Sequence, residues 1–560
     1  MVVSTTKQLS NTYNLWQRFS FSTDTRSWDA VAVPSWVGDK LNSAYTFIIS
    51  LALVQFWTIV LSLILFIALK KYKNDASQLD PLAVTLWNKR GDLVNSVTEM
   101  LGFGGTDWTR PWLLITIFIA VAAGVAKTAI TIVVAPLIII DHAAPVNPEA
   151  VYTPDPTPMD NQTRAARFAL EVPRFFRALG SAVVDNELRQ RVRISRPQRL
   201  GQTENGEDII RIDYSYGATG ADLGIQKYFD LIFNVTGSCV TDYGWFIDTN
   251  NSTGVLIDEY LPPFVDGIQY TSVFDGTEPS ATFYYGAQTR GTLDESNTTW
   301  GALVSSVGRT SFSAGADPWY LTAPISSEDT GAGNTVLSGR PGISCWQDDV
   351  WSYHGHNGTT AALTSNQLPG LNLSDSLQGT LAQYLGSPVI QQAGFQLQKA
   401  ALMSATTSLD QIFDAGASSL YNDLERLVLT AYVATINCLT DTTLYPVTAV
   451  GSVPNIAIGD RGVVPDDLGY VVWSPDVATL STLVIIVIPT ILVGVWLVAV
   501  VLIYWTPIKI VAILDSSSLQ DQKQGSSQES HSSPTVPGDI EGAKPPEKQS
   551  ESAPVSGTTT

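Results

Sequence analysis

The feature that most limits what this chain can be is a set of three long apolar segments, residues 46–69, 112–140 and 478–505. None of them contains Asp or Glu, and each exceeds the roughly 20 apolar residues that a helix needs to cross a bilayer. A core helix of a soluble protein rarely stays apolar on all sides for this length. The sequence therefore predicts an integral membrane protein with three transmembrane helices.

Basic residues in the short flanking segments predict the orientation of these helices, because Lys and Arg favour the cytoplasmic side. Lysines follow the first segment directly in "KKYK" (70–73), and Lys509 follows the third, whereas Asp141 and Glu149 follow the second. We therefore expect both the N-terminus and the region between helices two and three to lie outside the cell. The expected regions are an exoplasmic arm, 1–45; a cytoplasmic loop, 70–111; an ectodomain, 141–477; and a cytoplasmic tail, 506–560.

Acceptor triplets for N-linked glycans, Asn-X-Ser/Thr, occur only between the second and third apolar segments. Their confinement to one region predicts a glycosylated ectodomain, since chance triplets would be scattered. The acceptors are Asn161, Asn234, Asn250, Asn251, Asn297, Asn357 and Asn372. The three cysteines of the chain, Cys239, Cys345 and Cys438, lie in the same region. An oxidising compartment favours one disulfide among them, with the pairing left open.

Periodicity predicts a large mixed α+β ectodomain with helices on both sides of a β-rich middle. Apolar residues from Phe168 to Leu179, Phe176 among them, recur at helical spacing, and Pro173 predicts a kink or restart there. Short β-type runs and turn clusters alternate over residues 209–351. A second helical stripe runs from Leu420 to Cys438. The tail from about residue 515 has almost no large apolar residues and is expected to be disordered.

The stretch with most potential chemistry is "CWQDDVWSYHGHNGT" (345–359). On a strand, His354 and His356 share a face and could bind one metal ion together with Asp348 or Asp349. The two adjacent aspartates would point to opposite faces, so they would not form the facing carboxylate pair of a glycosidase. We therefore expect a polar, glycosylated surface loop and no metal or catalytic site. The residues of this stretch expected in the core are Cys345, Trp346 and Trp351.

Two further sets of charged residues have a simple structural interpretation. Lys127 lies inside the second apolar segment, and the other segments carry no acid to pair with it. We expect its side chain to extend to the membrane interface rather than take part in transport. Nine arginines and no lysine lie between Arg164 and Arg199. We expect a solvated helix face paired with acidic residues, the alternative being a docking surface for an acidic polysaccharide or partner.

The layout resembles a poorly characterised class of filamentous-fungal multi-pass membrane glycoproteins. The features that carry the resemblance are "KKYK" after the first span, "LWNKRGD" (86–92), and the ectodomain motifs "CWQDDVW" and "INCLTD". A single final span and a Ser/Pro-rich tail complete it. The class has no assigned activity. Some members resemble products of genes beside secondary-metabolite pathways, which implies an accessory rather than a catalytic part.

These features predict a cell-surface glycoprotein whose ectodomain binds, senses or structures something without catalysis. Gly-X-Ser-X-Gly, His-Glu-X-X-His and Walker A signatures are missing, so we expect neither an enzyme nor a cofactor. The expected partners are the lipid bilayer and a cell-wall or membrane protein, and a net charge of −20 argues against nucleic acid. Two alternatives remain. One is an ectoenzyme, a hydrolase using Asp348 or Asp349 with His354, and the other is a transporter subunit in which Lys127 meets an acid from a partner.

Overall fold

The structure is a computed structural model, and it describes only part of the chain. The described residues are 11–23, 26–71, 138–155, 160–184, 186–252, 255–263, 267–272, 279–285, 297–325, 333–407, 412–445, 453–457 and 469–505, with a few single residues between 118 and 125. Lys127, most of the predicted loop 70–111 and the tail 506–560 lie outside them.

The chain divides into two compact units. The first comprises Met1–Ile49 with Ala129–Ile491, and the second comprises Ser50–Thr128 with Leu492–Thr560. Everything below concerns the first unit, apart from the far ends of two apolar helices.

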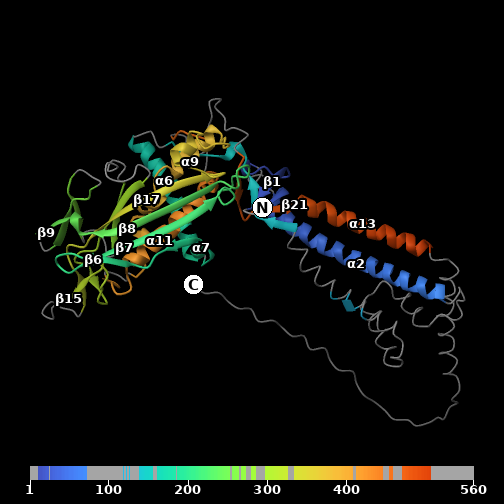
Figure 1. The fold of residues 1–560 in the computed structure, drawn as a ribbon, viewed down its shortest axis with the longest axis horizontal. Coiled ribbons are helices and arrows are strands. Elements are labelled where there is room, and N and C mark those ends of the chain that lie inside the picture. Colours follow the sequence, from blue (N-terminus) through green and yellow to red (C-terminus); the bar gives the residue numbers. More distant parts are fainter. Residues whose placement is uncertain are drawn as a thin grey trace, which may run out of the picture. The chain divides into compact units, whose positions relative to one another are not determined.

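A long antiparallel sheet forms the centre of the first unit, and β7, β8 and β17 are its longest strands (Figure 1). The strand order is β12-β13-β17-β8-β7-β5, with β6 paired to β7 and β18 paired to β17. The bounds are β5 Val192–Ile194, β6 Gln198–Gln202, β7 Asp208–Thr219, β8 Ile232–Asp242, β12 Ser280–Tyr285, β13 Asn297–Ser305, β17 Gly342–Tyr353 and β18 His356–Gly358. Two smaller sheets extend the β-rich part. They contain β9 Phe246–Ser252, β10 Val255–Tyr260 and β11 Gln269–Ser272, and β14 Thr310–Ser311, β15 Thr322–Pro324, β16 Asn334–Val336 and β19 Ile412–Phe413.

Helices precede and follow the β-rich region in the sequence, as the periodicity predicted, and they cover one face of the central sheet. They are α6 Asn161–Val184, α7 Asn186–Arg191, α8 Thr360–Thr364, α9 Asp375–Leu385, α10 Val389–Leu397, α11 Leu420–Ile436 and α12 Cys438–Asp441. Short 3-10 turns lie at Pro148–Ala150, Tyr243–Trp245, Gln398–Ala401 and Ser404–Thr407. The stripe predicted on α11 is confirmed, because its residues are buried through to Cys438. On α6, Phe175 and Leu179 are buried, but Phe168 and Phe176 are exposed, and Pro173 lies inside one helix without a restart.

A buried ion pair joins α6 to α12 beneath this helical layer. Arg174 is 1% exposed, and its guanidinium lies 3.1 Å from Asp441 and 4.2 Å from the ring of Tyr384. Arg177 contacts the other oxygen of Asp441 at 2.7 Å. A buried charge is stable only when it is paired and hydrogen-bonded, so these contacts fix the two helices together.

The two faces of the central sheet differ in character, as the period of two in a strand requires. On β7, Ile212, Tyr214 and Tyr216 are buried against the helices, while the alternate positions are half-buried. The strand β17 has the same pattern, which corrects one expectation. Trp351 and Cys345 face the helices and are buried, but Trp346 lies on the open face under the guanidinium of Arg211, 5.4 Å away.

A separate small sheet forms the root of two apolar helices. Its strand order is β1-β2-β21-β3, and β4 Ala143–Pro145 pairs with β20 Val471–Trp473 beside it. The four strands are β1 Arg18–Ser22, β2 Ser27–Pro34, β3 Ile139–Asp141 and β21 Val477–Ser481. Helix α2, Ser35–Lys71, follows β2 directly, and α13, Thr482–Trp505, follows β21 directly. Two parts of these helices are long and apolar enough to cross a membrane, Ser35–Leu63 and Thr482–Leu502.

The ends of the predicted spans therefore need correction. The first helix begins at Ser35 rather than residue 46, so part of the predicted arm 1–45 is helical. Residues 139–140 and 478–481 form strands and not the ends of transmembrane helices. They pair with each other, which satisfies their backbone groups in a sheet rather than in a helix. Most of the predicted second span, 112–140, lies outside the described residues.

Trp346 and Trp351 of β17 lie on opposite faces of the central sheet. Replacing each of them tests this strand register directly. Trp351→Ala should cost about 3–5 kcal/mol in the free energy of unfolding, because it removes a fully buried side chain from the core. Trp346→Ala should cost about 1 kcal/mol, the order of one half-exposed cation–π contact. Urea unfolding of the two purified variants beside the wild type measures both. Equal losses at the two positions would contradict the register.

Candidate functional site

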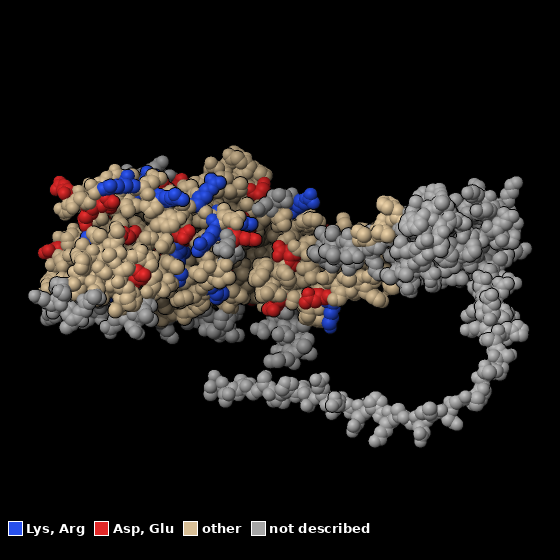
Figure 2. All heavy atoms as spheres, turned by 90° about the horizontal axis from the view of Figure 1, so that it is seen from below, with Lys and Arg blue, Asp and Glu red and all other residues tan. Residues whose placement is uncertain are grey.

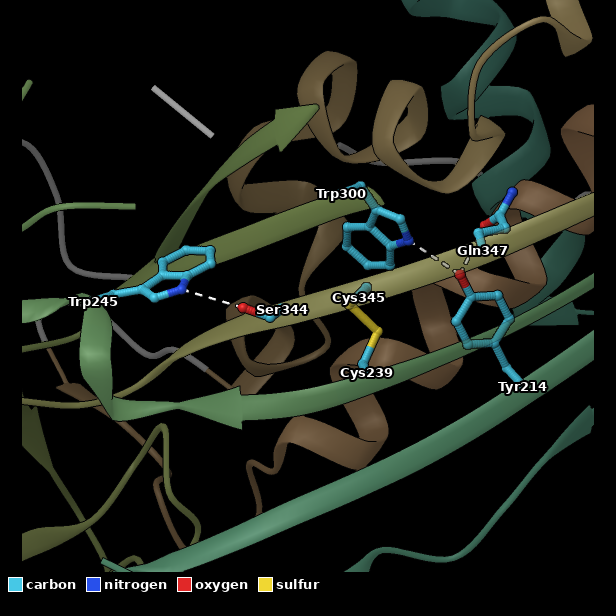
Figure 3. The surroundings of a disulfide bond; sticks show 7 residues. All are labelled: Tyr214, Cys239, Trp245, Trp300, Ser344, Cys345 and Gln347. Atoms are coloured by element: carbon cyan, nitrogen blue, oxygen red, sulfur yellow. Dashed lines mark hydrogen bonds between the residues drawn. A yellow bond between two sulfur atoms is a disulfide. The ribbon is translucent and has the colours of Figure 1, made fainter. Parts of the chain in front are cut away.

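Most of the stretch at residues 345–359 belongs to strands β17 and β18 of the central sheet. A disulfide lies in the middle of this sheet (Figure 3). Cys239 of β8 and Cys345 of β17 face each other across the strand pair and form this bond. Among the described residues Cys438 is the free cysteine, and it is buried at the start of α12. The disulfide closes a loop of more than 100 residues, so it restricts the unfolded chain strongly.

A chain of hydrogen bonds runs beside the disulfide on the buried face. Trp300 Nε1 donates to the hydroxyl of Tyr214 at 3.1 Å, and that hydroxyl donates to Gln347 Oε1 at 2.7 Å (Figure 3). Gln347 Nε2 donates in turn to Asp349 Oδ1 at 2.8 Å. Burial raises the pKa of Asp349 to about 7. The network satisfies buried polar groups, which is what a structural core requires.

The candidate metal and catalytic residues of this stretch are not brought together. Asp348 lies on the open face and Asp349 on the buried face, as expected for neighbours in a strand. His354 lies in the turn after β17, five residues beyond Asp349 and about 16 Å along the strand at its usual rise. Its ring contacts Asp230 at 3.0 Å and stacks on Tyr353. In the described part of the chain no three His, Cys, Asp or Glu residues are placed to hold a metal ion.

A cavity of about 440 Å³ lies instead against the small root sheet. Residues far apart in the sequence line it: Phe21 to Thr23 at the end of β1, Asp141 of β3, Arg191 of α7, the loop from Ala221 to Gln226, the segment Ile436 to Thr440 between α11 and α12, and Trp473 of β20. Nothing in the sequence marks these positions as a set. Asp141 is recognisable beforehand only as an acidic residue after the second apolar segment.

The loop between β7 and β8 shapes one wall of this cavity. Gly224 has a left-handed backbone, with φ of +86°, and a Cβ there would lie 2.0 Å from the carbonyl oxygen of Val471. Val471 N donates to the carbonyl oxygen of Gly224 at 2.8 Å, so the loop is held directly against β20. Ser22 N donates to the side chain of Gln226, which attaches β1 to the same loop. Only glycine fits where the two backbones approach so closely.

The charges around the cavity are unequal. Arg191 contacts Asp222 at 2.8 Å, and hydrogen bonds to Tyr432 and Asp222 raise the pKa of the guanidinium. Asp222 also accepts from the backbone and hydroxyl of Thr219, at 2.9 and 3.0 Å. Arg191 is therefore occupied within the protein, and Asp222 is neutralised by it.

A second group of buried acids lies at the start of α11, away from the cavity. Asp423 is fully buried and accepts from the Tyr320 hydroxyl and from Ser404 N, the latter at 2.9 Å. Asp317 accepts from Leu420 N at 3.0 Å, at the first turn of the helix. Burial raises the pKa of Asp423 to about 7 and that of Asp317 to about 6. Asp423, Tyr320 and their partner Ser404 are shut off from solvent, which suits a structural role rather than a catalytic one.

The arginines predicted as a solvated, paired face are mostly ion-paired. At least five of the nine contact carboxylates of the described residues: Arg167 with Glu171, Arg174 and Arg177 with Asp441, Arg191 with Asp222, and Arg199 with Asp208. Figure 2 shows basic and acidic side chains interleaved on the displayed face. This arrangement favours internal pairing over a docking surface of one sign.

Six of the seven glycan acceptors have described side chains, and all six are exposed. They are Asn161, Asn234, Asn250, Asn251, Asn357 and Asn372. Asn297 starts β13, but its side chain lies outside the described residues. Exposure is the condition that an N-linked glycan requires.

The fold and the site define a β-rich α+β domain attached to two apolar helices, with a cavity at the attachment. The chain belongs to the family described as "Domain of unknown function (DUF8406)", whose profile matches residues 172–472, more than half of the chain. The match contains the central sheet and all its covering helices except the first turns of α6. Neither the curated proteins nor the solved structures contain a match to the chain.

The buried acids predict a stability that increases as the pH falls. The folded pKa of Asp423 is about 7 against an ordinary 3.8, so the folded state binds the proton more tightly than the unfolded chain. Stability should therefore be lost as the pH rises from about 4 to 7. The melting midpoint should be several degrees higher at pH 5 than at pH 8. Asp423→Asn should reduce this difference, whereas Asp208→Asn, at an exposed pair, should leave it unchanged. A midpoint that rises toward pH 8 would contradict the assignment.

Proposed function

We propose that the chain is a three-span surface glycoprotein whose ectodomain binds a ligand without catalysis. The observation that carries this proposal is that both apolar helices begin in one sheet. Strand β2 pairs with β21, and each is followed at once by its helix. Tyr45 of α2 donates its hydroxyl to the carbonyl oxygen of Ile485 in α13, at 2.9 Å. Two spans that start side by side enter a bilayer from the same side.

The return of the chain supports a third crossing. The end of α2 is followed by β3, which pairs with β21 in the sheet where α2 began. If α2 crosses the bilayer, the segment between Lys71 and Ile139 must cross back an odd number of times. The apolar residues between 112 and 138 supply one such crossing.

Exposed tryptophans support the position of the bilayer. Trp16, Trp36 and Trp473 are 63%, 44% and 58% exposed, and all three belong to the root sheet, its flanks or the first turn of α2. In the central domain Trp245, Trp300, Trp319 and Trp351 are at most 1% exposed. Tryptophan is enriched where a protein meets lipid headgroups, because its ring is apolar and its N–H is polar. The root sheet has the side chains expected at that level.

The cavity beside the root supports a binding function. It is formed by groups from six separate segments, and its polar and apolar walls suit a small amphipathic ligand. Asp349 and Asp423, with their raised pKa values, do not line this cavity: Asp349 contacts Gln347, and Asp423 contacts Tyr320 and Ser404. Of the two carboxylates that line the cavity, Asp222 is paired with Arg191, which favours binding over hydrolysis by two free carboxylates.

Epitope accessibility tests the proposal. A tag at residue 2 should be stained on intact cells, and a tag at residue 555 should be stained only after permeabilisation. Glycosidase treatment should lower the mass of the chain by several glycans, with at most one on the neighbours Asn250 and Asn251. Staining of the N-terminal tag only after permeabilisation, or no change in mass, would overturn the three-span proposal.

A further inference from the structure

We propose that the cavity at the root sheet binds an organic ammonium group, such as a choline or other alkylamine head. This deepens the binding function proposed above by naming the ligand class of the same site. The cavity combines the carboxylate of Asp141, which has no ion-pair partner among the described residues, with two aromatic side chains, Phe21 and Trp473.

Asp141 supplies the negative charge. Among the described residues no Lys, Arg or His forms an ion pair with it, and its side chain accepts one hydrogen bond, from His142 N at 2.6 Å. The other carboxylate of the cavity, Asp222, is neutralised by Arg191. The lining charges therefore leave one net negative group, which attracts a cation and repels an anion.

Trp473 and Phe21 supply surfaces that an ammonium group prefers. The Trp473 side chain is 58% exposed on β20, and β20 pairs with β4, which starts two residues after Asp141. Phe21 also lines the cavity, although it is 7% exposed and packs with Phe19 and Trp28, so Trp473 offers most of the aromatic surface. A cation is attracted to an aromatic face, and the alkyl groups of an organic cation are stabilised further by leaving water.

Other ligand classes fit the cavity less well. An inorganic anion would be repelled by Asp141, and Arg191, the basic residue of the lining, is already paired with Asp222. A divalent metal would need several oxygen or nitrogen ligands, and the described residues contain no such cluster. A wholly apolar ligand would remove water from the carboxylate of Asp141 without replacing its charge interactions.

The ammonium group has two possible sources, because the root sheet lies where a bilayer headgroup would reach it under the proposed topology. The ligand is then either a soluble amine or the head of a zwitterionic lipid. Both present the same chemistry to Asp141 and Trp473, so the experiment must separate them.

The test is titration calorimetry of choline into the full-length protein in nanodiscs of phosphatidylglycerol, which carries no ammonium group. We expect saturable binding, weakened at least tenfold by Asp141→Asn and by Trp473→Leu. Asp141→Glu keeps the negative charge and should retain choline binding. If Asp141→Asn loses choline binding and Asp141→Glu does not, the cause is the missing charge and not misfolding. Asp230→Asn and Trp36→Leu, outside the cavity, serve as matched controls and should bind as the wild type does.

A second arm repeats the titration in phosphatidylcholine nanodiscs. If choline no longer binds in these nanodiscs, the phosphatidylcholine headgroup already occupies the cavity and is the ligand. If choline binds as before, the ligand is a soluble amine. Both results support the proposed ligand class. The proposal is overturned if choline fails to bind in phosphatidylglycerol, if Asp141→Asn binds normally, or if inorganic phosphate binds as well as choline. None of these results depends on membrane orientation, so failure here and failure of the epitope test are distinguishable.

Discussion

The pairing of β2 with β21 is the constraint on which the rest of the structure depends. It joins Ala30–Pro34 to Val477–Ser481, segments separated by more than 440 residues, so it forms only when the domain between them is folded. Both apolar helices start from this pair, and a hydrogen bond from Tyr45 of α2 to Ile485 in the first turn of α13 links them. Ala478 and Leu480 of β21 pack with Val33 and Tyr45 in one apolar cluster. The folded domain thereby determines where and in which direction both helices begin.

The central domain in turn supports the cavity wall formed by the segment between α11 and α12. Asn437 and Thr440 line the cavity, and the next residue, Asp441, receives Arg174 and Arg177 from α6. The disulfide and the Trp300–Tyr214–Gln347 hydrogen bonds fix the middle of the sheet that carries α11. A site supported on several rigid elements keeps its shape without a ligand. The protein therefore loses less conformational entropy when the ligand binds. The exposed Trp473 is the part of the wall that remains free to meet a ligand.

Periodicity predicted the parts of the fold that local patterns determine and missed those set by long-range pairing. The helical stripe ending at Cys438, the α+β class and the opposite faces of Asp348 and Asp349 follow from spacing alone. Residues 478–481 read as part of an apolar span because composition does not distinguish a buried strand from a membrane helix, and their partner, β2, lies far away in sequence. Trp346 was assigned to the core by its size, but strand parity places it on the open face beside Arg211. The cavity was not predictable, since its residues come from six segments that only the tertiary fold brings together.

The most direct test of the central claim adds a glycan acceptor to the loop between the first two spans. The added acceptor reports the side of the membrane on which this loop lies. Val97→Thr completes an acceptor triplet at Asn95, far from both neighbouring apolar segments. If the chain crosses the membrane three times with its ectodomain outside, this variant has the same mass as the wild type before and after glycosidase treatment. Asn357→Gln should lose one glycan and shows that the assay resolves a single site. An additional glycan on the Val97→Thr variant would place residue 95 on the same side as the ectodomain and contradict the account.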